Sequence, residues 1–371
     1  MPGSLRRLRL PAAAAVAAIA AGGVALWLAE RSLGPRRAAV VAIFAATYVV
    51  IAIGKFPGLY LDRAGAALLG ASLMIAAGVL PLDAALHAID FDTVALLLGV
   101  MIVVANLRLS GFFRWIGNWA VARDGHPLVL LAAVILTAGF FSAFLVNDTI
   151  CLALTPLVLD LVLRLRRDPV PYLLAVAMAS NIGGAATITG NPQNIMIGSL
   201  SGISYTSFAA SLAPVAAIGL VVLFGLIAVL HPAEFRTRER LDARPMPAHA
   251  HRALAIKSAL AAVAMTAGFF VGWPPAEVAL LVGAASLLTR AVKSEKVYRE
   301  IDWPLLLMFA GLFIVVAGFE KALLTPTIVA GIGRQHLGST PVLALVTAAL
   351  SNLVSNVPAV LVLKPFIPAL A

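Results

Sequence analysis

Residues 180–194 read Ser-Asn-Ile-Gly-Gly-Ala-Ala-Thr-Ile-Thr-Gly-Asn-Pro-Gln-Asn, and this polar stretch interrupts an apolar run over 172–197. An apolar run of this length is long enough to cross a membrane. Its glycines allow the backbone to leave helical geometry, and Pro192 suits the first turn of a helix that starts again. Non-helical backbone at membrane depth is tolerated only where it is buried in protein or lines a wet cavity. The stretch therefore predicts a broken membrane helix at a binding site.

The composition of the whole chain agrees with a membrane protein. Of its 371 residues, 61% are hydrophobic and 12% are charged, whereas soluble domains carry about 25% charged residues. The single cysteine, Cys151, excludes a disulfide framework and a thiolate zinc cluster. The net charge of +10 comes from basic residues in short segments between apolar runs, which indicates membrane topology. We expect the lipid bilayer, and no nucleic acid, as a partner.

The apolar runs predict an all-α polytopic fold. Nine runs are predicted to cross the membrane, and the run 172–197 contains the break described above. Two more runs, 127–163 and 341–371, contain polar residues in the middle and are predicted to be re-entrant hairpins. If the N-terminus is cytoplasmic, 21 of the 27 Lys and Arg residues fall inside, although the 29–37 loop is an exception. This bias predicts an integral protein of a bacterial-type inner membrane. Residues 108–126 are predicted to form an interfacial helix. The nine predicted crossings lie near 10–28 (alternatively a cleaved signal), 38–54, 64–80, 93–107, 172–197, 210–230, 254–271, 276–289 and 303–319.

An internal repeat organises the chain. Residues 99–105 (GVMIVVA) match 311–317 (GLFIVVA) at an offset of 212, and Ser142, Asn147 and Pro156 fall on Ser351, Asn356 and Pro365 at an offset of 209. An odd number of predicted membrane crossings separates the start of the first copy from the start of the second. The second copy is therefore expected to have the opposite orientation in the membrane. Inverted repeats with discontinuous helices are typical of secondary transporters, which bind substrate and ions near the midplane. The predicted parts are an N-terminal helix and loop (1–37), repeat one (38–230), a basic cytoplasmic linker (231–253) and repeat two (254–371).

The same offset predicts the second broken helix at about 389–403, which is beyond the last residue, 371. The second repeat is thus expected to be incomplete. The sequence is interpreted as a fragment of a longer transporter, with a truncated gene product as the alternative.

Two polar breaks supply the candidate site residues. Helix N-termini at such breaks can hold an anion, while Ser, Thr and Asn oxygens and free carbonyls can coordinate a cation such as sodium. An intramembrane carboxylate is a functional candidate by default, so Asp148 can bind a cation or carry a proton; its alternative role is to cap a helix. The coupling ion is predicted to be sodium or a proton, with no further cofactor. The candidates are Ser142, Asn147, Asp148 and Thr149 at the first break and Ser180, Asn181, Gly183, Gly184, Thr187, Thr189, Gly190, Asn191, Pro192 and Asn194 at the second.

At these breaks the chain resembles the ion transporter superfamily, which includes divalent anion:sodium symporters, citrate transporters, arsenite permeases and some sodium/proton antiporters. The resemblance rests on Asn181-Ile-Gly-Gly, on Gly190-Asn-Pro-Gln-Asn194 and on the tip from Ser142 to Thr149. It implies one sodium site with Ser142, Asn147 and Gly190, a second with Ser355 and Asn356, and a homodimer. Where the symporters have Ser-Asn-Thr, this chain has Val146-Asn147-Asp148 and Ser355-Asn356-Val357. The Asn147-Asp148 pair is more similar to the arsenite permeases.

The leading hypothesis is a secondary transporter, driven by sodium or protons, that moves a small carboxylate or inorganic oxyanion by alternating access. The alternatives are an arsenite or metalloid efflux permease, a sodium/proton antiporter and, from a different class, a passive channel. An enzyme is not expected, because Asp83, Asp90 and Asp92 lie in a short loop and are interpreted as solvated charges. Substrate identity and transport direction stay open at this point.

Overall fold

A computed structural model describes residues 35–54, 60–115, 126–236, 252–289, 291–323 and 339–364. Within these ranges every regular element is a helix, as the composition predicted. Six helices are long and apolar enough to cross a membrane. The predicted helix at 10–28 lies outside the described ranges, as does most of 108–126. The part of 108–126 that is described corrects the prediction at its start, because α5 continues through Arg108 to Leu109 before the chain turns.

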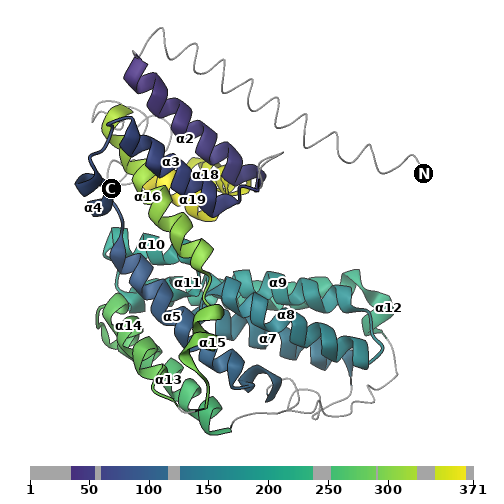
Figure 1. The fold of residues 1–371 in the computed structure, drawn as a ribbon. Helices are drawn as coiled ribbons and strands as arrows, with labels where there is room; N and C mark the ends of the chain where they lie inside the picture. The colour runs from purple at the N-terminus through teal and green to yellow at the C-terminus, as the bar shows by residue number, and fades with distance from the viewer. Residues whose placement is uncertain are drawn as a thin grey trace. The chain divides into compact units, whose positions relative to one another are not determined.

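The chain divides into two compact units, residues 1–94 with 303–371 and residues 95–302. In the first unit, α3 packs against both α2 and α16 (Figure 1). Gly311 of α16 faces Ala67 of α3 and Gly318 faces Met74, so these two helices run parallel. The described helices of this unit are α2 (Pro35–Ile53), α3 (Arg63–Ala76), α4 (Leu82–His87), α16 (Trp303–Leu323), α18 (Thr340–Val354) and α19 (Asn356–Leu363).

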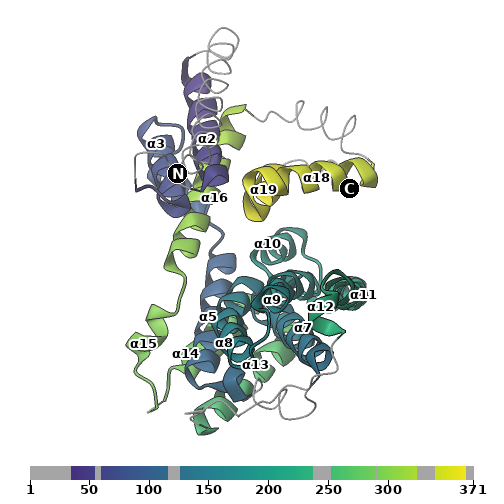
Figure 2. The same ribbon diagram turned by 90° about the vertical axis from the view of Figure 1, so that its right-hand side faces the viewer.

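In the second unit, α9 packs against both α7 and α8 (Figure 2), and α11 packs against α7 and α9. The predicted broken helix is present as α9 (Pro169–Gly184), a short 3₁₀ turn η1 (Ile188–Gly190) and α10 (Pro192–Ser201). The other helices are α5 (Phe91–Leu109), whose first residues belong to the first unit, α7 (Pro127–Phe144), α8 (Asn147–Arg164), α11 (Tyr205–Leu230), α12 (Pro232–Phe235), α13 (Arg252–Val271), α14 (Pro275–Ser286) and α15 (Ser294–Arg299).

Two very close helix crossings at glycines, one in each unit, occupy equivalent positions in the two predicted repeats. In the second unit, a Cβ on Gly99 of α5 would lie 2.3 Å from the carbonyl carbon and oxygen of Ala279 of α14. In the first unit, a Cβ on Gly311 of α16 would lie 2.6 Å from the carbonyl carbon of Ala67 of α3. Gly99 and Gly311 are 212 residues apart in the sequence, and so are Ala67 and Ala279. Only glycine permits these backbone approaches.

Both predicted hairpins turn at a strained residue. Val146 joins α7 to α8 with φ 55°, and Ser355 joins α18 to α19 with φ 77°. These two positions are 209 residues apart. The only other non-glycine residue with positive φ in the described ranges is Arg166. A positive φ is unfavourable for a residue with a Cβ, especially a β-branched one, and such strain is concentrated at functional sites.

Candidate functional site

The first hairpin tip is hydrogen-bonded to the break in the neighbouring helix. Val146 is fully buried at the tip, and its N–H donates to the carbonyl of Thr189 at 3.3 Å. In the opposite direction, the hydroxyl of Thr187 donates to the carbonyl of Ala143, the penultimate residue of α7. These bonds satisfy backbone groups at the end of α7 and in the break, as burial requires. The two polar breaks predicted from the sequence thus form one structural site.

Two asparagine side chains hold the break between α9 and α10 in shape. The side-chain oxygen of Asn191 accepts from the N–H of Asn194 at 2.8 Å and so caps α10, while Pro192 occupies its first turn. The Asn194 amide donates to the carbonyls of Thr187 at 2.9 Å and of Gly184 at 3.2 Å. Both side chains are buried. Their amides satisfy carbonyls that the interrupted helix leaves without intrahelical partners.

The glycines of the site permit close contacts between backbones. A Cβ on Gly190 would lie 2.1 Å from the carbonyl oxygen of Gly184, and a Cβ on Gly184 would lie 2.7 Å from that of Gly190. A Cβ on Gly183 would lie 2.1 Å from the carbonyl oxygen of Gly139 in α7. Glycine is therefore required here for packing, in addition to the conformational freedom inferred from the sequence.

Two buried polar atoms at the tip have no hydrogen-bond partner. They are the hydroxyl oxygen of Ser142, which is fully buried, and the side-chain oxygen of Asn147, which is 5% exposed as a residue. The Asn147 amide itself donates to the side-chain oxygen of Asn181 at 3.1 Å, which turns the Asn147 oxygen away from Asn181. Unpaired buried oxygens are costly and rare in native structures. Uncharged oxygens of this kind are suitable ligands for a hard cation.

The remaining candidates surround this pair. Asp148 is exposed and Thr149 partly buried in the first turn of α8, where a carboxylate interacts favourably with the helix dipole. Ser180 and the Asn181 amide donate to the carbonyl of Ala177 within α9. No group of three His, Cys, Asp or Glu residues that could hold a metal is found in the described part of the chain. The site is therefore built from neutral oxygens and one nearby carboxylate.

Ser355 and Asn356 lie in the other unit, at the tip of the second hairpin. Asn356 begins α19, and its side-chain oxygen accepts a hydrogen bond from the hydroxyl of Ser351. Ser351 and Asn356 correspond to Ser142 and Asn147 at the 209-residue offset. The second hairpin thus presents the same pair of residue types, here bonded to one another.

Tyr205 belongs to the site, although the sequence reading did not select it. Its hydroxyl lies 2.7 Å from that of Thr189, and Tyr205 is 4% exposed. It is the first residue of α11, capped by Ser204. A tyrosine directly after a helix cap, close to a polar break, was a signal that could have identified it, because buried tyrosines need a partner for the hydroxyl.

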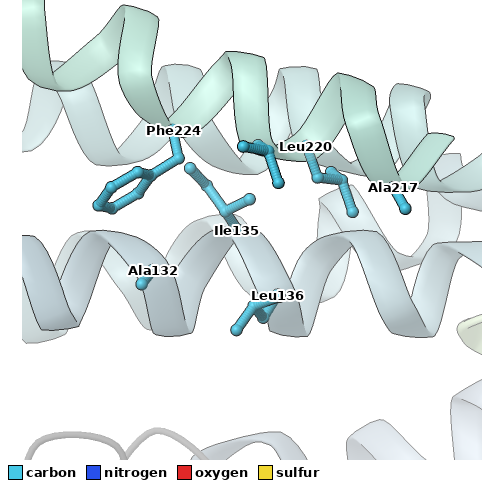
Figure 3. A pocket seen from close by; sticks show the side chains of 7 residues that line it. Ala132, Ile135, Leu136, Ala217, Leu220 and Phe224 are labelled. Atoms are coloured by element: carbon cyan, nitrogen blue, oxygen red, sulfur yellow. The ribbon is translucent and has the colours of Figure 1, made fainter. Parts of the chain in front are cut away.

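A groove between α7 and α11 has the opposite character. Its volume is about 340 Å³, and Figure 3 shows only carbon in the side chains that line it. An apolar groove of this kind offers no group to orient a polar ligand. The two polar breaks of this unit meet at the C-terminal end of α7, at the hairpin tip. The groove is lined by Ala132, Ile135, Leu136, Ala217, Leu220, Val221 and Phe224.

Comparison with known proteins defines the class. A family model described as citrate transporter matches residues 48–371. The chain belongs to this family, and it is a transporter and not an enzyme. It is 30% identical over 348 residues to an uncharacterized transporter of Mycobacterium tuberculosis strain H37Rv, covering 89% of this chain and 80% of that protein. It is 27% identical over 391 residues to a silicon efflux transporter of Oryza sativa subsp. japonica (88% and 81%). An inner membrane protein of Escherichia coli K12 is 33% identical over 282 residues (76% and 73%).

Proposed function

We propose that this chain is a cation-coupled secondary transporter of a small anion, either a carboxylate or an inorganic oxyanion, in a bacterial-type inner membrane. The proposal of cation coupling rests on one observation, that the buried side-chain oxygens of Ser142 and Asn147 have no hydrogen-bond partner. Sodium bound between them satisfies both atoms, and Gly190 lies in the adjacent break. The amide groups at the start of α10 then supply a positive dipole end for the anion, without a buried Lys or Arg.

Alternating access is proposed to rest on inverted repeats with a cytoplasmic N-terminus. Two pairs of equivalent positions support the repeat. The crossings at Gly99 and Gly311 share an offset of 212 residues, and the strained tips at Val146 and Ser355 share an offset of 209. Ser355 and Asn356 would form the second ion site, and the working unit would be a homodimer.

A second candidate function is export of a small metalloid acid. It is favoured by the similarity to a protein named silicon efflux transporter and by the Asn147-Asp148 pair at the tip. A neutral acid avoids electrostatic repulsion by an ionised Asp148. In this version, Asp148 carries the coupling proton.

The sodium proposal is tested first by thermal unfolding of purified protein in sodium chloride and in choline chloride. A ligand that binds only the native state stabilises it by about 2.7 kcal/mol at a concentration of 100 times its Kd. Ser142→Ala should remove the sodium-dependent rise in Tm. In choline it should unfold no earlier than wild type, because the change removes an unpaired buried hydroxyl that costs about 1–3 kcal/mol.

The matched control is Ser211→Ala. This serine is exposed in α11 and donates to the carbonyl of Ser207. It should keep the sodium response. A sodium response that survives Ser142→Ala would remove this residue from the site.

Transport is measured in proteoliposomes with labelled citrate, phosphate and silicic acid under imposed sodium or proton gradients. We expect one of them to move only with a gradient, and Asp148→Asn to abolish dependence on the proton gradient if the proton is coupled. Flux that is indifferent to both gradients would identify a passive channel and refute the proposal.

A further inference from the structure

A basic hollow lies in the first unit, whereas Ser142 and Asn147 belong to the second. Its volume is about 430 Å³. Three basic side chains line it, Arg36 and Arg37 from the start of α2 and Lys321 from the end of α16. All three are exposed. Residues far apart in the sequence thus bring like charges together around one concave surface.

The fold explains why the three charges meet. Since α16 runs parallel to α3, the C-terminal ends of both helices lie together, and α2 is antiparallel to them, with Thr47 beside Gly70 and Arg36 beside Gly78. The Arg36 guanidinium donates to the carbonyl of Gly78, which follows α3, and is thereby fixed at the rim. The hollow is therefore a feature of the packed helix ends.

The charge of the hollow is not compensated within the described part of the chain. No acidic side chain lines it, and no described residue forms an ion pair with Arg37 or Lys321. Like charges that line one hollow repel one another, which favours binding of an anion between them. They also depart from the positive-inside pattern, because the proposed topology places Arg36, Arg37 and Lys321 outside. The excess of basic residues on the cytoplasmic side, which sets the orientation of the helices in the membrane, therefore does not account for this cluster.

The rest of the lining is apolar and includes Val40, Val79 and Pro81. Basic groups at the rim and apolar side chains below them match an amphipathic ligand, with its phosphate on the cations and its glycerol and acyl region against the helices. A soluble anion would use only the rim. Basic pockets between membrane helices on the cytoplasmic side bind anionic lipid headgroups, and the hollow offers the same combination of groups on the opposite side in the proposed topology.

We propose that this hollow binds the phosphate headgroup of an anionic phospholipid. Arg37 and Lys321 contact the phosphate oxygens from opposite helices, and Arg36 adds charge while it keeps its bond to Gly78. A lipid held here would join the ends of α2, α3 and α16. The site is independent of the proposed ion site, and its test does not require transport.

The test is lipid binding by native mass spectrometry of the purified chain, with affinities from titration. Binding of phosphatidylglycerol is compared with binding of phosphatidylcholine. Inorganic phosphate is titrated separately as a soluble anion without acyl chains. The variant is the triple Arg36→Gln, Arg37→Gln, Lys321→Gln. The control triple Arg114→Gln, Arg252→Gln, Lys296→Gln removes the same charge from exposed positions outside the hollow. The melting temperature of each variant verifies that it is folded.

We expect wild type and the control triple to bind phosphatidylglycerol in preference to phosphatidylcholine. The hollow variant should bind phosphatidylglycerol about a hundredfold more weakly, because each basic residue near an anionic headgroup contributes roughly fivefold. Equal loss in both triples, equal binding of the two lipids, or binding of inorganic phosphate without phosphatidylglycerol would each overturn the proposal. If the triple variant does not fold, Lys321→Gln alone should weaken binding by roughly fivefold, and unchanged binding would overturn it.

Discussion

The contact between Gly184 and Gly190 gives the sharpest prediction, which concerns Gly190→Ala. The added Cβ would lie 2.1 Å from the carbonyl oxygen of Gly184 and 2.7 Å from its carbonyl carbon. Both atoms are backbone, so no rotamer change relieves the clash, and the two sides of the break must separate by about 1 Å to restore normal contact. Overpacking of a filled interior costs about 1–3 kcal/mol.

The matched control is Gly225→Ala in α11, where a Cβ would meet nothing within 4 Å. Alanine is favoured over glycine in a helix by about 0.5–1 kcal/mol, so this change should stabilise the protein slightly. The difference between the two variants is then about 1.5–4 kcal/mol. For a chain of 371 residues the melting temperature shifts by about 1.3 °C per kcal/mol, so Gly190→Ala should melt about 2–5 °C below Gly225→Ala.

The assay is thermal unfolding of both variants in the same detergent, in choline and in sodium chloride. Gly190→Ala should also lose the sodium-dependent rise in Tm, because the break no longer supports the tip at Asn147. A Gly190→Ala protein that melts at or above Gly225→Ala would refute the packing argument. If Gly190→Ala melts at the wild-type temperature but shows no sodium-dependent rise in Tm, the geometry of the break matters for ion binding alone.

Three further predictions concern the rest of the helical framework. Arg167→Ala should destabilise the protein by about 2–3 kcal/mol, since the side chain of Glu234 is only 11% exposed and keeps the Tyr172 hydroxyl but loses its 2.8 Å charged partner; a loss below 1 kcal/mol in chemical unfolding would contradict this. Thr189→Val should cost about 1 kcal/mol by removing the bond to Tyr205, and in a Tyr205→Phe background the same change should cost much less. Ser355→Gly should raise stability by about 1 kcal/mol, because φ 77° and ψ 161° suit only glycine; a lower melting temperature would argue against strain at the second tip.

Much of the fold could be predicted because a membrane-spanning helix requires a long apolar run, which can be seen directly in the sequence. The apolar run at 303–319 became α16, and the polar stretch at 180–194 contains both the end of α9 and the start of α10. These outcomes follow from local chemistry. A helix must satisfy its own backbone in lipid, and Gly, Asn and Pro mark where it stops and restarts.

Contacts between distant residues could not be predicted in this way. The sequence suggested that Gly190 allows an irregular backbone, but its contact with Gly184 requires two segments to approach one another. The participation of Tyr205 depends in the same manner on where α11 begins relative to the break. Neither contact produces a periodic pattern of residues in the sequence.

By itself, the sequence determined that this protein is a helical membrane protein with two polar breaks, and it selected Ser142, Asn147 and Asn194 as candidate site residues. Only the tertiary structure decided that the first hairpin tip bonds to the broken helix, and that Ser142 and Asn147 keep unpaired oxygens there. The physical reason is that hydrophobicity and helix termination are local properties of the chain. Whether a buried oxygen is satisfied depends on every neighbour that packing brings to it.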